Sequence, residues 1–135
     1  MRIHPLAVVD PAAIVADDVQ IGPLSVVEGD VVIGEGCQIS PHVVIKNGTT
    51  LGPGNTVHEG TVLGGVPQHV NVPDRPGRLV IGAGNTIREN VTFHRSMSED
   101  GEPVVGDNSL FMVNTHVAHH CRVGNHPNFP NNSLT

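Results

Sequence analysis

The 135-residue chain has no tryptophan or tyrosine and only three phenylalanines, so aromatic side chains are almost missing. Lysine and arginine together number seven against thirteen aspartates and glutamates, which gives a formal net charge of −6. Nucleic-acid-binding proteins combine a basic stripe with aromatic rings on which bases stack. The scarcity of both features excludes that class of function.

The chain also lacks any apolar run that approaches the roughly 20 residues of a membrane-spanning helix. Its first residues, Met1 to Pro5, show no secretory signal-peptide pattern. These absences favour a cytoplasmic location without membrane insertion. With 38% hydrophobic residues, 16 glycines and 11 prolines, the chain is expected to fold as one compact, helix-poor domain.

What the first half of the sequence does contain is an aliphatic residue at every sixth position. The series is Ile3, Val9, Val15, Ile21, Val27, Ile33, Ile39, Ile45, Leu51, Val57 and Leu63. Neither an amphipathic helix nor a plain half-buried strand has a six-residue period, whereas hexapeptide repeats are typical of parallel β-helices. The repeat therefore predicts an all-β fold of that kind.

Each six-residue unit can be interpreted as one short strand and a corner. Two residues before each aliphatic stands a mostly small side chain, and Gly22, Gly34, Gly52 and Gly64 directly follow aliphatic positions. A small inward residue, a variable outward one and an aliphatic inward one reproduce the alternation of a strand. Three units would close a triangular coil of about 18 residues, and coils would stack about 4.8 Å apart through parallel ladders.

The two cysteines, Cys37 and Cys121, both fall in the small inward position of their units. That position faces the core, and free cysteine is among the residue types most often buried. We therefore predict reduced core thiols in place of a disulfide or a metal-binding pair.

The outward positions differ between the three predicted faces, of which one is uniformly apolar. The faces carry, in turn, Val8, Val26, Val44 and Val62; Ile14, Val32 and Thr50; and Gln20, Gln38 and Thr56. A contiguous apolar stripe on a rigid scaffold is typical of an interface, and closed symmetric self-association usually buries it. The alternative is that strands simply favour valine. We favour self-association.

The six-residue register breaks twice. The breaks lie between Leu63 and Ile81 and between Phe93 and Val105, so loops are expected at about 64–80 and 95–104. The repeat resumes at Ile81, Ile87 and Phe93, and again at Val105, Phe111, Val117, Val123 and Phe129. Loops that leave a rigid scaffold commonly carry binding and catalytic residues, so the flanks of these loops are the first candidates for a site.

Histidines cluster at the flanks of the second break. His94 directly precedes it, while His116 and His119 follow it. Zinc sites commonly pair histidines a few residues apart, but a strand period of two gives His116 and His119 different orientations, so the metal signal is weak. A single histidine with a pKa near neutrality would suit general-base catalysis without a metal. Corner residues without a catalytic role are the alternative.

Several segments together carry a family resemblance. They are the opening IHPLAVVDP (3–11), the loop GGVPQ (64–68), the stretch IGAGNTIRENVTFHR (81–95), and HVAH (116–119) followed by VGNH (123–126). In these segments the chain resembles the N-terminal half of the UDP-N-acetylglucosamine O-acyltransferase family. The resemblance is collinear and implies a left-handed β-helix, a homotrimer with active sites between subunits, and the first step of lipid A biosynthesis.

The resemblance also implies a reaction and a set of site residues. A (3R)-hydroxyacyl chain would move from acyl carrier protein to the 3-hydroxyl of UDP-N-acetylglucosamine, with no cofactor and no metal. His119 aligns with the catalytic base of the family. Pocket-lining and phosphate-contacting positions are implied at His116, His94, Gln68, Arg78, Arg88 and Arg95.

Residues 1–135 would then form a truncated β-helix domain, since the helical C-terminal domain of the family is absent from them. Other hypotheses stay open. A non-catalytic relative is suggested by His120 and His69, which stand where the family has acidic residues. A trimeric metalloenzyme similar to γ-class carbonic anhydrases would use the same scaffold, although the ligand pair of that class has no matching histidines around His116. The related N-acyltransferase carries a similar histidine motif together with an extra N-terminal domain.

Overall fold

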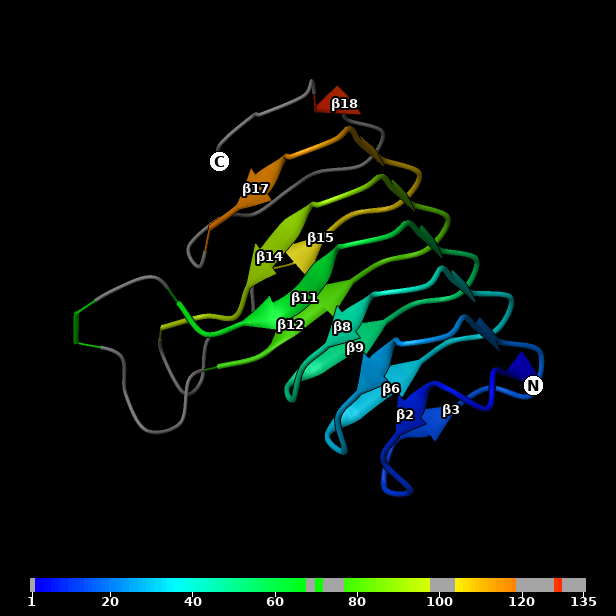
Figure 1. Ribbon diagram of the computed structural model, residues 1–135. Coiled ribbons are helices and arrows are strands. Elements are labelled where there is room, and N and C mark those ends of the chain that lie inside the picture. The colour runs from blue at the N-terminus through cyan, green and yellow to red at the C-terminus, as the bar shows by residue number, and fades with distance from the viewer. Residues whose placement is uncertain (1, 68–69, 72–76, 98–103, 119–127, 130–135) are drawn as a thin grey trace.

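The computed structural model describes residues 2–67, 70–71, 77–97, 104–118 and 128–129. Within these ranges every regular element is a short β-strand, and the strands stack into three parallel sheets (Figure 1). The three sheets confirm the predicted all-β parallel β-helix and are consistent with the left-handed winding that the resemblance implied. None of the described residues forms a helix long and apolar enough to cross a membrane.

The three sheets are named A, B and C here, in the order in which the chain first visits them. Sheet A comprises β1 (Arg2–Ile3), β4 (Gln20–Ile21), β7 (Gln38–Ile39), β10 (Thr56–Val57), β13 (Thr86–Ile87), β16 (Leu110–Phe111) and β18 (Asn128–Phe129). Sheet B comprises β2 (Val8–Val9), β5 (Val26–Val27), β8 (Val44–Ile45), β11 (Val62–Gly65), β14 (Thr92–His94) and β17 (His116–Val117). Sheet C comprises β3 (Ile14–Val15), β6 (Val31–Ile33), β9 (Thr49–Leu51), β12 (Leu79–Ile81) and β15 (Val104–Val105).

The strand register confirms the predicted coil in the first half of the chain and shows longer coils after it. Val26 pairs with Val8 and Val44 pairs with Val26, so each regular coil consists of three six-residue units, as predicted. Thr92, however, pairs with Val62, and His116 pairs with Thr92, so both of these coils are longer than a regular one. The additional residues fall between β11 and β12 and between β14 and β15. These are the two places where the breaks in the six-residue register predicted loops.

The aliphatic repeat forms the core, as predicted. From Ile21 upward its described members are at most 3% exposed, and they include Phe93 and Phe111, whose rings meet edge to face at a centroid distance of 5.0 Å. Ile3, in contrast, is 37% exposed, because it lies on β1, an edge strand of sheet A in the described residues. Val123 lies outside the described residues, as does the side chain of Phe129.

The small inward position before sheet A holds buried asparagines in two consecutive coils. The side-chain amide of Asn55 donates to the carbonyls of Gly52 and Gly82, both at 2.7 Å, and its Oδ1 accepts the backbone N–H of Asn85 at 2.8 Å. Asn85 repeats the arrangement, since its Oδ1 accepts the N–H of Ser109 at 2.8 Å. Asn55 and Asn85 are at most 1% exposed, so each tightens a corner and satisfies buried backbone groups.

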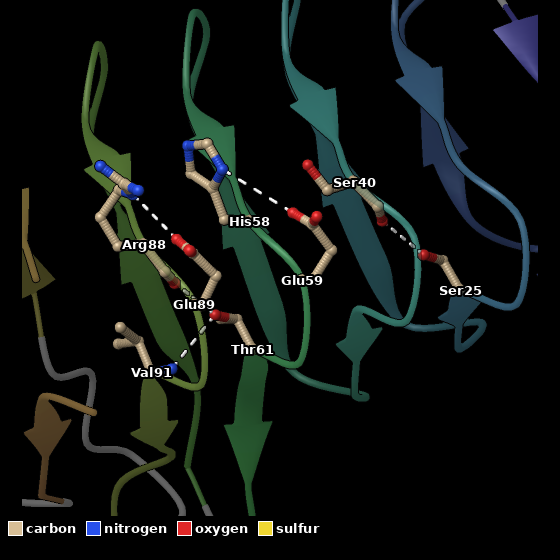
Figure 2. Close-up of polar contacts among 8 residues, drawn as sticks. All are labelled: Ser25, Ser40, His58, Glu59, Thr61, Arg88, Glu89 and Val91. Carbon is tan, nitrogen blue, oxygen red and sulfur yellow. Dashed lines mark hydrogen bonds and ion pairs between the residues drawn. The ribbon is translucent and has the colours of Figure 1, made fainter. Parts of the chain in front are cut away.

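Hydroxyl groups fulfil the same task at the corner between sheets A and B (Figure 2). Thr61 Oγ1 donates to the carbonyl of Arg88 at 2.7 Å and accepts the N–H of Val91 at 3.2 Å. Ser25 Oγ donates to the carbonyl of Ser40 at 2.8 Å. Side chains that the sequence pattern marks only as small thus link consecutive coils.

Cys37 is a buried, reduced thiol, as predicted. Its Sγ donates to the carbonyl of Gly52 at 3.1 Å, and burial raises the pKa of the thiol. A protonated, enclosed thiol is a poor nucleophile, so Cys37 belongs to the core. Cys121 lies outside the described residues.

Candidate active site

Two of the predicted site histidines lie next to each other on sheet B. His94 ends β14, His116 begins β17, and these two strands are paired. The ring centroids are 4.6 Å apart at an interplanar angle of 74°, which is an edge-to-face contact. Both side chains are half-buried, so the pair combines partial desolvation with access from outside.

His116 occupies its place because of the strand alternation in sheet B. The outward positions form one row in which each residue pairs with the next: Val8, Val26, Val44, Val62, Thr92 and His116. We call this set the sheet B row. His116 is therefore the sixth member of a row whose first four members are the valines that predicted an interface.

The ring of His94 is placed by an irregularity in β11. The register shifts between Leu63 and Gly65, so that Gly65 pairs with His94. A Cβ at residue 65 would lie only 3.0 Å from Cδ2 of His94, so glycine at this position leaves space for the imidazole. The N–H of Arg95 donates to the carbonyl of Gly65 at 2.9 Å and fixes the strand beside it.

The environment of His116 favours the neutral imidazole. Its Nδ1 lies 2.6 Å from Oγ1 of Thr92, the residue with which it pairs in the ladder. Burial lowers the pKa of His116 below its ordinary value of 6.5, because a charged ring loses solvation there. At neutral pH His116 thus serves as a hydrogen-bonding group more readily than as a cation.

Arg78 and Arg95 come together at the corner between sheets B and C, near the bases of both predicted loops. Arg78 Nη1 donates to Oδ2 of Asp30 at 2.9 Å, and Gly77 is tied to Ser96 by a backbone hydrogen bond of 2.8 Å. Burial lowers the pKa of Arg95, while Glu28 and Asp30 counteract that effect. The Arg95 guanidinium stays charged at neutral pH.

Arg88 lies at a different corner, between sheets A and B, and its partner is Glu89 (Figure 2). Arg88 Nε donates to Glu89 Oε1 at 2.8 Å, and this bond raises the pKa of Arg88 and lowers that of Glu89. Since β14 runs from this corner to the corner of Arg78 and Arg95, the structure does not bring all three arginines together.

The predicted base His119 and the predicted ligand contact Gln68 lie outside the described residues, as do His69 and His120. Among the described residues no group of three or more histidine, cysteine, aspartate or glutamate side chains is placed to hold a metal ion.

Thr92 and Asp30 contact site residues and were missed by sequence reasoning. The signal for Thr92 is its place in the sheet B row, but that place becomes visible only when the lengths of the longer coils are known. Asp30 contacts Arg78, which lies 48 residues later, and no local sequence pattern predicts that pairing.

Comparisons with known proteins agree with this geometry. The bacterial transferase hexapeptide model (six repeats) matches residues 12–47 and 30–65. Acyl-(acyl carrier protein)–UDP-N-acetylglucosamine O-acyltransferases of Halorhodospira halophila and Cupriavidus pinatubonensis are 50% and 58% identical over 133 residues, 98% of this chain. Those residues are 52% and 50% of the two relatives, so the chain spans about half the length of the curated relatives it matches.

A solved structure is similar over the same extent. LpxA from Acinetobacter baumannii superimposes with a TM-score of 0.94 at 39% identity, covering 98% of this chain and 52% of that one. Sequence and backbone similarity therefore extend together over nearly the whole chain. The chain belongs to the UDP-N-acetylglucosamine O-acyltransferase family of hexapeptide-repeat proteins.

Proposed function

We propose that the protein is an O-acyltransferase that moves a (3R)-hydroxyacyl chain from acyl carrier protein to the 3-hydroxyl of UDP-N-acetylglucosamine, the first step of lipid A biosynthesis. The names of its relatives support the donor and acceptor. The observation that carries the proposal is the contact between His94 and His116 at the end of the sheet B row, where His94 directly precedes the second predicted loop.

The chemistry requires a base because a sugar hydroxyl is a poor nucleophile until its proton is removed during attack. We assign this base to His119, three residues after His116. The hydroxyl oxygen attacks the thioester carbon and its proton passes to the imidazole. The tetrahedral intermediate then collapses, the new ester forms, and the carrier thiol leaves with the proton that the imidazole returns. His116 and His94 line the pocket, and Gln68 contacts the nucleotide sugar.

Arginines supply the positive charge that a nucleotide diphosphate needs. Arg78 and Arg95 lie together beside the bases of both predicted loops, and a guanidinium group can bind two phosphate oxygens at once. Arg88, at the other edge of β14 and exposed, is placed for a second phosphate, such as that of the pantetheine arm of the carrier. We assign the arginines to two different phosphates because Arg78 and Arg95 lie at one corner of the coil and Arg88 lies at another.

The proposed assembly is a homotrimer whose active sites lie between subunits. Support comes from the valines of the sheet B row, since Val8 is 64% exposed and Val26, Val44 and Val62 stay half-buried in the single chain. Burial of such a stripe is favourable by about 25 cal/mol per Å² of apolar surface. A cytoplasmic location is part of the same proposal.

The deciding experiment is a mass-spectrometric assay of the full-length gene product with UDP-N-acetylglucosamine and a panel of 3-hydroxyacyl carrier proteins. We expect an acylated nucleotide sugar, and its loss in His119→Ala. His4→Ala is the matched control, because His4 directly follows β1 in the first coil, where its Nδ1 accepts the N–H of Leu6. Retained turnover in His119→Ala would refute the base. Absence of transfer with every carrier would favour a non-catalytic relative.

A further inference from the structure

At one position in the sheet B row a polar side chain replaces an apolar one of nearly the same shape. Val62 is followed in the row by Thr92, and valine and threonine have nearly the same volume and branching. The difference is one hydroxyl group. It appears on the strand directly below His116, where a methyl group would serve the packing equally well.

That hydroxyl is used by the histidine above it. Thr92 Oγ1 lies 2.6 Å from Nδ1 of His116, and the backbone pairing of the two residues holds the groups in line. The structure gives the hydroxyl no second acceptor among the described residues. A hydroxyl carries one proton, so the bond is satisfied when Thr92 donates and Nδ1 accepts.

We propose that Thr92 is a positioning residue that holds His116 as the tautomer protonated on Nε2, and that His116 donates a hydrogen bond to the substrate through this nitrogen. A neutral imidazole has one donor and one acceptor nitrogen, and the partner of one nitrogen sets the role of the other. With Nδ1 occupied by the hydroxyl, Nε2 is a donor and has no lone pair with which to accept a proton.

The assignment separates the roles of two histidines that stand three residues apart. His116 cannot be the general base while Thr92 donates to it, whereas its Nε2–H suits a hydrogen bond to a substrate oxygen that strengthens in the transition state. The reversed bond, with Nδ1 donating to Thr92, would leave Nε2 as a base. The two arrangements make opposite predictions about which ring nitrogen carries the proton.

The donor role toward substrate rests on the proposed function, but the tautomer does not, so the two are tested separately. The first experiment is nitrogen-15 NMR of the histidine rings in the full-length protein at neutral pH, with His116 assigned by substitution. We expect Nε2 to be the protonated nitrogen in the wild type and in Thr92→Ser, and a mixture of tautomers in Thr92→Val. Thr86→Val, at the outward position of β13 on sheet A, is the matched control and should leave the spectrum unchanged.

The Thr92→Val protein is expected to fold, because valine occupies the equivalent position in four coils of the same sheet. A wild-type His116 protonated on Nδ1, or a Thr92→Val spectrum identical to that of the wild type, would overturn the proposal. These results do not depend on turnover.

The second experiment compares acyl transfer by the same variants. Loss of one well-oriented hydrogen bond is worth about 1.4 kcal/mol, so kcat should fall about tenfold in Thr92→Val with KM little changed. Thr92→Ser should restore the rate. Unchanged kcat in Thr92→Val despite altered tautomers would overturn the donor role. Absence of turnover in the wild type would contradict the proposed function and with it the donor role, while the tautomer result would stand.

Discussion

The lower coils, residues 2–63, and the upper coils, residues 79–118, share one architecture but differ in coil length and in the residues at outward positions. In the lower coils every step along the sheet B row takes three six-residue units and the row is valine. In the upper coils the steps are longer, and the row continues as Thr92 and His116. Phe93 and Val117, the inward neighbours of these two residues, remain buried.

The difference shows which positions the fold needs and which it leaves free. Backbone pairing and inward aliphatic residues hold the coils, so an outward position can bear an interface or a catalytic group without a change of register. Insertions are tolerated at corners for the same reason. In this chain the candidate site occupies the outward positions of two strands, beside the corners that are lengthened.

The largest effect is expected at the junction between the two regions. The Asn55 amide donates to the carbonyls of Gly52 in its own coil and Gly82 in the next, and Oδ1 accepts the N–H of Asn85. Asn55→Ala removes these three buried hydrogen bonds, which should lower the free energy of unfolding by about 3 kcal/mol. The measurement is urea unfolding.

The matched control for that junction is Thr56→Ala, because Thr56 is the next residue and points outward. It should cost under about 1 kcal/mol. Equal losses in the two variants would show that the junction does not depend on the buried amide.

A smaller loss is expected at a point where the backbones of two coils approach each other closely. A Cβ at Gly52 would lie 2.7 Å from the carbonyl oxygen of Gly82, which is backbone and cannot move aside. Gly52→Ala should therefore destabilise by about 2 kcal/mol through overpacking. At Gly29 a Cβ would meet only the exposed carboxylate of Asp10, so Gly29→Ala is the control for thermal unfolding. A larger loss at Gly29 than at Gly52 would be incompatible with this contact.

The lower region also contains a strained corner that can be relieved. Leu24 has a φ of 63° and is 54% exposed, while the equivalent corners of the upper coils use Asn90 and Asn114, with φ of 57° and 64°. Left-handed backbone costs a leucine about 1 kcal/mol that asparagine largely avoids, so Leu24→Asn should stabilise by about that amount. Leu6→Asn makes the same chemical change without positive φ and should not stabilise. A thermal melt that shows no gain for Leu24→Asn contradicts the strain.

The smallest effect concerns pH and belongs to the upper region. Because burial lowers the pKa of His116, the folded protein binds fewer protons than the unfolded chain just below pH 6.5. The free energy of unfolding should therefore decrease as the pH falls through this range, and less steeply in His116→Asn. Denaturant titrations above and below pH 6.5 measure the difference. An identical slope in both proteins would contradict the lowered pKa.

Much of the fold could be predicted from the sequence, because the length of a repeat determines the spacing of strands and corners. The six-residue spacing predicted the coil, the buried aliphatics and the division of outward residues into three faces, all of which the described coils show. Handedness came only from the family resemblance, since spacing is the same for either hand. Asn55 falls in the small inward position of the repeat, but the hydrogen bonds of its buried side chain involve backbone groups of a neighbouring coil that no local pattern reveals.

The site was less predictable than the scaffold. His94 and His116 were predicted as site residues because they flank a break in the register, where loops commonly carry functional groups. The structure places their rings in contact. The partners Thr92 and Asp30 escaped notice because their contacts span 24 and 48 residues. Such contacts depend on how many residues each insertion adds, which a repeat cannot specify.

The central claim is that the valines of the sheet B row form the interface on which the site depends. Its most direct test is the mass in solution of the full-length Val44→Lys protein, determined by sedimentation velocity. We predict that the wild type and Gln38→Lys, altered on sheet A, sediment with the mass of three chains, and that Val44→Lys sediments with the mass of one. A Val44→Lys protein that keeps the mass of the wild type would contradict the interface.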